Sequence, residues 1–139
     1  MSPPGSLLSR IREQGFPEDG ARPVVTLEEF FEGNDDLGSI GCNLTEHPGP
    51  QRFYAVLRDV RGRGDVQDVL VAITEDMGDD EWPFSDSIYV VTSASREQVA
   101  QWVAELQPDP LGGEGYFPTA PGAAPALKPG FRVYTLWWD

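Results

Sequence analysis

The densest group of side chains that could do chemistry is an acidic stretch near the middle of the chain. Asp79, Asp80 and Glu81 are consecutive, Asp86 follows them, and residues 35–36 form a second acidic pair. Clustered carboxylates are the hard ligands that Ca²⁺ and Mg²⁺ prefer, but the spacing lacks the alternate ligands and central glycine of an EF-hand loop. Runs of like charge usually stay solvated, so we predict no metal site here. We predict instead that residues 79–81 are an exposed surface that can bind a partner.

The single cysteine and the single histidine lie five residues apart, at Cys42 and His47. Such a pair can form an activated thiolate nucleophile, in which the imidazole takes the thiol proton. The alternating pattern around Cys42, however, places its thiol on a buried face as a small hydrophobe, and His47 precedes a Pro-Gly turn. One Cys and one His also fall short of the four ligands of a closed zinc site. We therefore assign no catalytic residue and expect no cofactor.

Aromatic residues are the third candidate. The C-terminal segment is a predicted strand, whose successive side chains point to opposite faces of the sheet, and it carries large residues at both odd and even positions. Trp137 and Trp138 therefore cannot both point towards helices that cover only one face. We expect one of these two tryptophans on the free face of the sheet, with Tyr134 or its alternates and Tyr89 or its neighbours; which face each tryptophan occupies stays open. The binding residues that we choose are Tyr89, Tyr134, Trp138 and Trp82. An aromatic sheet face can serve a dimer interface, a small-molecule pocket or base stacking. We favour a homodimer, with coverage by an adjacent chain segment as the alternative.

Charge narrows the choice of partners. The 139 residues include 10 basic and 23 acidic side chains, a net charge of −13, with 40% apolar and 11% aromatic residues. This composition is that of a folded domain rather than a disordered acidic tail. A strongly negative field repels nucleic-acid phosphates and anionic membrane surfaces. We therefore expect no nucleic acid and no membrane among the partners, and a basic protein as a possible one.

Arginines gather in one part of the chain. Four of them lie within residues 51–63, where the only acidic residue is Asp59, so this stretch carries +3 and the remainder −16. Such a face could dock an acidic partner or a second copy of the chain. Pairing with nearby acidic residues such as Asp65 and Asp68 is the more usual outcome.

The expected location is cytoplasmic. No apolar run approaches the roughly 20 residues of a membrane span, residues 1–20 lack the hydrophobic stretch of a signal peptide, and one cysteine cannot form an internal disulfide. The preference for Arg over Lys, with abundant Gly, Pro and Ala, is typical of a GC-rich bacterial genome.

Hydrophobic periodicity predicts the elements that would hold these residues. Residues 24–139 are expected to form one α+β domain, and residues 1–23 an extended or loosely attached arm with at most a short helix around Leu7 to Arg12. A short helix begins at the capping box of Thr26 and Glu29. The further predicted elements are strands at 38–44, 69–73, 88–92 and 131–138, a helix from Pro50 to about residue 61, and a second helix capped by Ser95 and Gln98.

The order strand, helix, strand, strand, helix, strand is that of a ferredoxin-like split βαβ fold. In that fold two helices cover one face of a four-stranded antiparallel sheet. The function that we predict is a non-catalytic binding or regulatory protein that acts through protein–protein contacts. The alternative is a small enzyme or small-molecule-binding domain with a pocket between the sheet face and residues 108–130, a Gly/Pro-rich stretch without periodicity.

Overall fold

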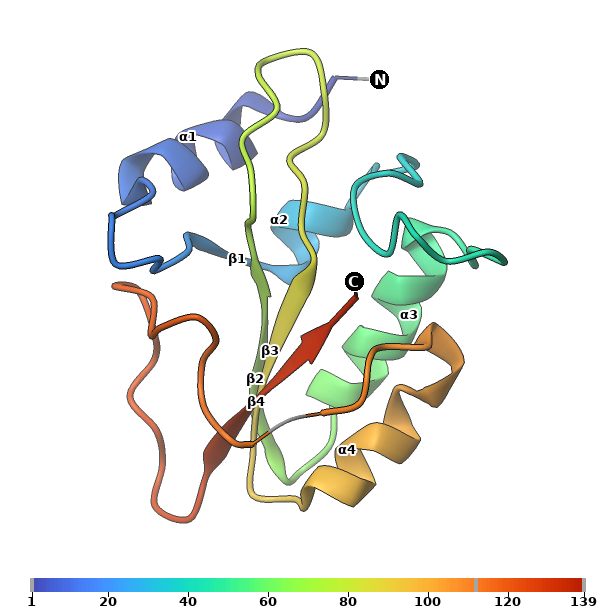
Figure 1. Ribbon diagram of the computed structural model, residues 1–139, viewed down its shortest axis with the longest axis vertical. Coiled ribbons are helices and arrows are strands. Elements are labelled where there is room, and N and C mark those ends of the chain that lie inside the picture. Colours follow the sequence, from blue (N-terminus) through green and yellow to red (C-terminus); the bar gives the residue numbers. More distant parts are fainter. Residues whose placement is uncertain (1, 112, 139) are drawn as a thin grey trace.

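The computed structural model describes residues 2–111 and 113–138 and contains one four-stranded antiparallel sheet with helices (Figure 1). The predicted α+β class and four-stranded antiparallel sheet are confirmed. The strands lie in the order β1-β2-β3-β4. In chain order the elements are α1 (Gly5–Gln14), β1 (Val24–Thr26), α2 (Leu27–Phe31), α3 (Pro50–Arg61), β2 (Val66–Ala72), β3 (Ser87–Thr92), α4 (Arg96–Trp102), the 3-10 turn η1 (Ala104–Leu106) and β4 (Arg132–Trp137).

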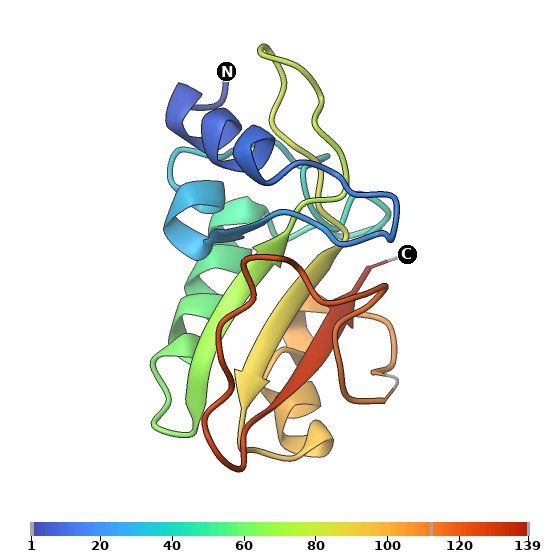
Figure 2. The ribbon, with the colours of Figure 1, turned by 90° about the vertical axis from the view of Figure 1, so that its left-hand side faces the viewer.

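One face of the sheet packs against helices. α3 begins with Pro50, whose fixed φ suits the first helical position, and its apolar residues recur at three- and four-residue spacing on one stripe. That stripe packs with α4 and the sheet residues Val69 and Val71 in the main core. In Figure 1, α3 and α4 lie on the same side of the sheet. In Figure 2, both helices lie behind the strands.

Both predicted capping boxes form. Thr26 accepts from the Glu29 backbone N–H while the Glu29 carboxylate accepts from the Thr26 N–H, at 3.1 and 2.9 Å. Ser95 and Gln98 make the same reciprocal pair at the start of α4. These bonds satisfy backbone donors that the first turn of a helix leaves unpaired.

The other face of the sheet is covered by the irregular segment before β4. A second core joins sheet residues such as Leu70, Tyr89 and Val133 to Tyr116 and Phe131 of that segment. Figure 2 shows residues 113–131 lying in front of β2 and β3. Tyr89 is fully buried there, and its hydroxyl donates to the carbonyl of Phe117 at 2.9 Å. The aromatic face is therefore covered by the chain itself.

On both edge strands, β1 and β4, some backbone groups are hydrogen-bonded by residues that lie outside the sheet. The Gln14 side chain, at the end of α1, donates to the Val24 carbonyl and accepts from the Val24 N–H, both at 2.8 Å. At the opposite edge, the N–H of Gly115 donates to the Val133 carbonyl and the N–H of Asp109 to the Trp137 carbonyl, both at 2.7 Å.

The predicted ferredoxin-like arrangement is wrong in its first strand and its strand order. Residues 38–44 form turns, with a single parallel bridge from Ile40 to Ser85, and the first strand is the short β1. Gly41 adopts φ +62, where an added Cβ would lie 2.9 Å from Phe53. A left-handed residue against a packed ring cannot belong to a regular strand. With β1 paired to β2, the strands follow chain order.

The expectation of a loose arm over residues 1–23 is also wrong. Residues 5–14 form α1, in which Leu7, Leu8 and Ile11 are buried and Leu7 and Ile11 join the main core. Arg12 on this helix forms ion pairs with Asp76 and Asp79 at 2.7 and 2.9 Å. The short helix expected around residues 7–12 is therefore present as part of α1, but it packs into the core instead of being loosely attached.

Candidate binding surfaces

Of the aromatic residues predicted on the free sheet face, the structure places only Tyr89 there. Tyr134 and Trp138 belong to the core beneath the helices, and their choice as binding residues of the open face was wrong. The residue on that side of β4 is Trp137, which is 41% exposed. Large side chains occur on both faces of β4, so their size alone could not show which set faces the helices. Thr135, the polar residue between Val133 and Trp137, was the signal for the less buried side.

Trp82 and Trp138 serve the interior. Their side chains are 3% and 6% exposed, and each indole N–H donates to a backbone carbonyl, that of Phe30 at 2.9 Å and that of Leu106 at 2.8 Å. A buried indole normally finds such a partner. Both indole N–H groups are therefore used within the protein.

The segment that follows Trp82 is a structural junction. Ser85 is fully buried, donates its hydroxyl to the Ala72 carbonyl at 2.7 Å, and its backbone N–H donates to the Ser39 carbonyl at 2.8 Å. The next residue, Asp86, accepts from the Trp138 N–H through its own carbonyl. Three chain segments distant in sequence meet at these two residues.

The Asp86 carboxylate centres a polar cluster. One oxygen accepts from Arg22 at 2.6 Å, Ser87 at 2.7 Å and Thr74 at 3.0 Å. Burial by itself would raise the pKa of Asp86, but the hydrogen bonds from Ser87 and Arg22 outweigh it and hold the pKa below its ordinary value. The carboxylate is therefore held by an ion pair and two hydroxyl donors within the protein.

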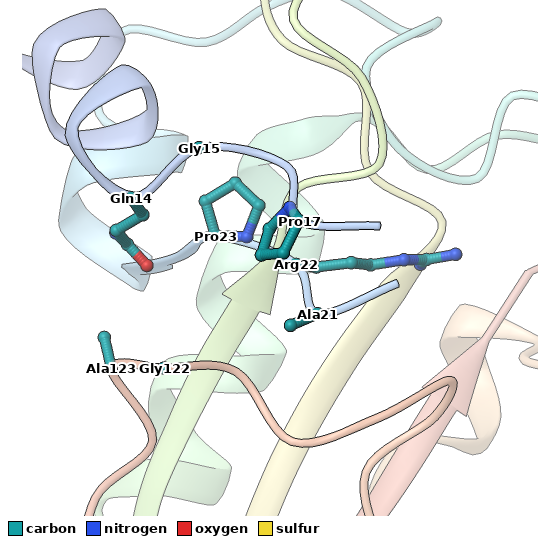
Figure 3. A pocket seen from close by; sticks show the side chains of 8 residues that line it. All are labelled: Gln14, Gly15, Pro17, Ala21, Arg22, Pro23, Gly122 and Ala123. Atoms are coloured by element: carbon teal, nitrogen blue, oxygen red, sulfur yellow. The ribbon is translucent and has the colours of Figure 1, made fainter. Parts of the chain in front are cut away.

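A cavity of about 280 Å³ lies beside this cluster, between residues 14–23 and the pair Gly122 and Ala123 (Figure 3). Its walls include Pro17 and Pro23. Arg22 is the only titratable residue that lines it, and Figure 3 shows that side chain running away from Gln14. Because Asp86 already pairs with Arg22, the cavity offers no uncompensated charge to a ligand.

Cys42 and His47 do not form a nucleophilic pair. Cys42 is exposed, contrary to its predicted burial, because residues 38–44 turn instead of forming a strand. The His47 ring is held from both sides: Nε2 lies 2.6 Å from the Ile40 carbonyl, and Nδ1 accepts from the Gly49 N–H at 2.9 Å. An imidazole with both nitrogens bonded to backbone shapes the 40–49 loop instead of transferring a proton.

The predicted acidic residues are exposed. Asp79 pairs with Arg12, whereas Asp80 and Glu81 have no ion pair within the described part of the chain. Within residues 2–111 and 113–138, no group of three or more His, Cys, Asp or Glu is arranged to hold a metal ion. The carboxylates point into solvent, as a solvated surface requires.

The arginines of residues 51–63 contact other groups within the molecule, and no ion pair among the described residues joins them to Asp65. Arg52 forms a bidentate pair with Glu105, and Arg61 forms one with Glu28. Arg58 and Arg63 instead stack over aromatic rings. The guanidinium carbon of Arg58 lies 4.7 Å from the ring centre of Tyr54, and that of Arg63 lies 4.3 Å from the ring centre of Trp102. Such contacts satisfy the guanidinium groups locally.

The net charge is confined to one part of the molecule. Residues 2–49 and 73–86, which form the upper part of Figure 1, contain 15 acidic and 3 basic side chains, a net −12. The other described segments contain 7 of each sign and balance. All three bases in the acidic part are paired, Arg10 with Glu29, Arg12 with Asp76 and Asp79, and Arg22 with Asp86. We call this part the acidic end.

Exposed apolar side chains occur in the same loops. Leu37 is 54% exposed and Met77 is 41% exposed, and each lies within one of the two acidic loops, 32–38 and 75–81. Methionine is enriched in protein interfaces, whose apolar centre is commonly surrounded by polar residues. The acidic end therefore combines charge with apolar contact area.

A further cavity lies beside β4 and was missed by the choice of Tyr134 and Trp138. It measures about 400 Å³ and separates the strand from the 110–117 segment. We call it the aromatic cavity; its described lining is Pro110, Gly113, Glu114, Gly115, Tyr116, Phe117, Thr135 and Trp137. Its place between the sheet and the irregular segment matches the pocket of the alternative prediction.

The fold and these surfaces define a small α+β protein whose exposed features are loops and one aromatic cavity. In the described residues, no helix is long and apolar enough to cross a membrane. A family model described as "Uncharacterized protein YfbO family" matches residues 3–136, and the chain belongs to this family. It is 41% identical over 122 residues to "Uncharacterized protein YfbO" of Escherichia coli (strain K12), covering 87% of this chain and 86% of that protein. No solved structure matches the chain.

Proposed function

We propose that this protein is a non-catalytic binding protein whose acidic end docks a basic protein partner. The observation that carries this proposal is the separation of charge, with −12 in residues 2–49 and 73–86 and balance in the other described segments. A surface of one sign steers a partner of the opposite sign and raises its association rate.

Apolar groups at the acidic end favour a protein partner over a simple cation. Leu37 and Met77 can be buried only by a partner that brings apolar surface of its own. The carboxylates around them are spread over two loops and do not converge. A basic protein with a shallow apolar surface fits both features.

The polar groups of the interior support a binding role over catalysis. His47 is fixed by backbone bonds, and the Asp86 cluster is satisfied by Arg22, Ser87 and Thr74. Catalytic sites usually hold a titratable group whose proton can be exchanged with a substrate. The proposed location is the cytoplasm, an inference from the sequence alone.

A matched pair of double variants tests the proposal. Asp80→Asn/Glu81→Gln removes two charges from the acidic end, and Asp59→Asn/Glu97→Gln removes two exposed charges from the balanced segments. Both have the same net charge, and they neutralise groups in different parts of the molecule; Glu97 also loses an exposed ion pair with Arg96 at 3.8 Å. The wild type is used to isolate a stoichiometric partner from the source cell, and association is then measured with each variant.

We expect a basic partner that binds the 80/81 variant about three- to tenfold more weakly, mainly through a slower association rate that salt suppresses. The 59/97 variant should bind as the wild type does. Equal weakening of both variants, an acidic partner, or no stoichiometric partner would each contradict the proposal.

Self-association through the second face of the sheet stays a prediction. Because residues 113–131 cover that face, a dimer would require this segment to move, or would have to use its outer surface with Phe117 and Trp137. The acidic end does not depend on either event.

A further inference from the structure

The aromatic cavity has a distinctive combination of side chains. Its lining residues include the aromatic residues Tyr116, Phe117 and Trp137, and Glu114 is the only charged residue among the described lining residues. None of these lining residues is basic. Phe117 and Trp137 are both exposed, at 61% and 41%.

Aromatic rings present a negative face that attracts cations, most strongly in Trp. The carboxylate of Glu114 among the lining residues adds an attraction of the same sign. An anionic ligand would meet repulsion from both. A neutral apolar ligand would gain burial but no electrostatic attraction.

The volume of the cavity and the hydrogen bonds of its polar groups restrict the class of ligand further. A cavity of about 400 Å³ exceeds the needs of a bare ion and lies in the range of small organic ligands. The Thr135 hydroxyl already donates to the Gly115 carbonyl at 3.0 Å. A ligand that must receive several hydrogen bonds therefore finds few donors, whereas an alkylated ammonium group needs none.

We propose that the aromatic cavity binds a small organic cation, an alkylated ammonium compound, between Trp137, Phe117 and Glu114. This site is separate from the acidic end and does not depend on the proposed protein partner. Arg132 and Arg96 line a neighbouring depression that shares Glu114. The rings should therefore contribute more to affinity than the carboxylate does.

The test uses a charged probe and its neutral isostere. Choline is titrated into the intact protein, alongside 3,3-dimethylbutan-1-ol, which has the same shape without the charge. Backbone amide shifts in an NMR titration locate the site and give the dissociation constant. We expect millimolar choline binding with shifts at Gly115, Thr135 and Trp137, and at least fivefold weaker binding of the neutral alcohol.

Variants separate the contributions of ring and carboxylate. Trp137→Leu, at an exposed position, should weaken choline binding about tenfold, Trp137→Phe less, and Glu114→Gln about threefold. Leu127→Ala is the matched control, because Leu127 is 46% exposed and does not line the cavity. It should bind choline as the wild type does.

An alkylated ammonium group could also be carried by a side chain of another protein, such as a trimethylated lysine. A second titration with acetyl-trimethyllysine amide distinguishes this source: tighter binding than choline indicates a peptide-borne cation, and weaker binding a free one. The inference is overturned by equal binding of the neutral alcohol, by choline shifts outside the cavity, by unchanged affinity in Trp137→Leu, or by no saturable binding at about 50 mM. The 80/81 variant should keep choline binding, so the two proposals can fail separately.

Discussion

Helices close one face of the sheet, and an irregular segment closes the other. On the helix side, side chains of α3 and α4 pack with Val69 and Val71 in a continuous core. On the other side, Tyr116 and Phe131 pack on a smaller core, and hydrogen bonds hold residues 113–131 at several points. These bonds include Tyr89 to Phe117, Thr135 to Gly115, the Gly115 N–H to Val133, and the Gln67 side chain to Ala126 and Lys128.

The irregular cover is also less complete. Phe117 and Leu127 remain exposed, and the buried Tyr116 hydroxyl has no partner among the described atoms. A buried unpaired hydroxyl lowers stability, and segments with few buried apolar contacts open at lower free energy. The comparison teaches that the face with the weaker cover is also the one that offers a cavity.

The largest expected effect comes from the helix face. Leu57 is fully buried in α3, so Leu57→Ala should lower the free energy of unfolding by about 2–5 kcal/mol, through lost burial and the cavity left behind. Urea denaturation measures it. The control Leu127→Ala, on the irregular segment, should change stability by less than about 0.5 kcal/mol. Similar losses in the two variants would remove the distinction between the faces.

An intermediate effect is expected at the second face. Tyr89→Phe removes the hydroxyl that donates to the Phe117 carbonyl and should cost about 1 kcal/mol. Hydrogen exchange should accelerate at Gly115 and its neighbours while the amides of α3 change little. Equal acceleration throughout the protein would show that the cover opens only with global unfolding.

The same tyrosine gives a pH dependence. Burial raises the pKa of Tyr89 from 10.0 to about 12, so the folded state holds the phenol proton more tightly than the unfolded state. The wild type should therefore lose stability relative to Tyr89→Phe as pH rises from about 10 through about 12. Parallel pH profiles for the two proteins would contradict this expectation.

The smallest effect concerns the pair that joins α2 to α3. The hydrogen bond from Arg61 lowers the pKa of Glu28 from 4.5 to about 2. A lowered folded-state pKa stabilises the protein above pH 4.5, and that contribution is lost as pH falls towards 2. The pair is partly exposed, so Glu28→Gln should cost less than about 1 kcal/mol at pH 7. Urea midpoints at pH 7 and pH 2.5 should show the difference shrinking.

Local signals in the sequence predicted the local elements well. The capping boxes at Thr26 and Ser95, the stripe of α3 and the β-branched run of β2 each depend on neighbours within one turn or one strand. The first strand failed for a long-range reason: β1 has three residues, and it is held by pairing with β2 and by the Gln14 side chain. No local pattern encodes such pairing.

The site residues were harder to predict. Sequence reasoning recognised an acidic surface at 79–81 and a pocket near residues 108–130, but it chose the wrong parity in β4. Trp137 and Trp138 have the same size, and the helix side was decided by the indole bond of Trp138 to Leu106 across the core. That bond depends on η1, where α4 breaks after Trp102, a break that the apolar periodicity did not indicate.

The bonds of Gln14, Asp109 and Gly115 to the two outer strands have a consequence for crowded solutions. An unprotected outer strand can template the addition of a strand from a neighbouring molecule, the first step of runaway assembly into fibres. Here a single amide side chain occupies both backbone groups of Val24, and two backbone N–H groups occupy carbonyls of β4. Growth of the sheet across molecules must first displace part of the chain itself.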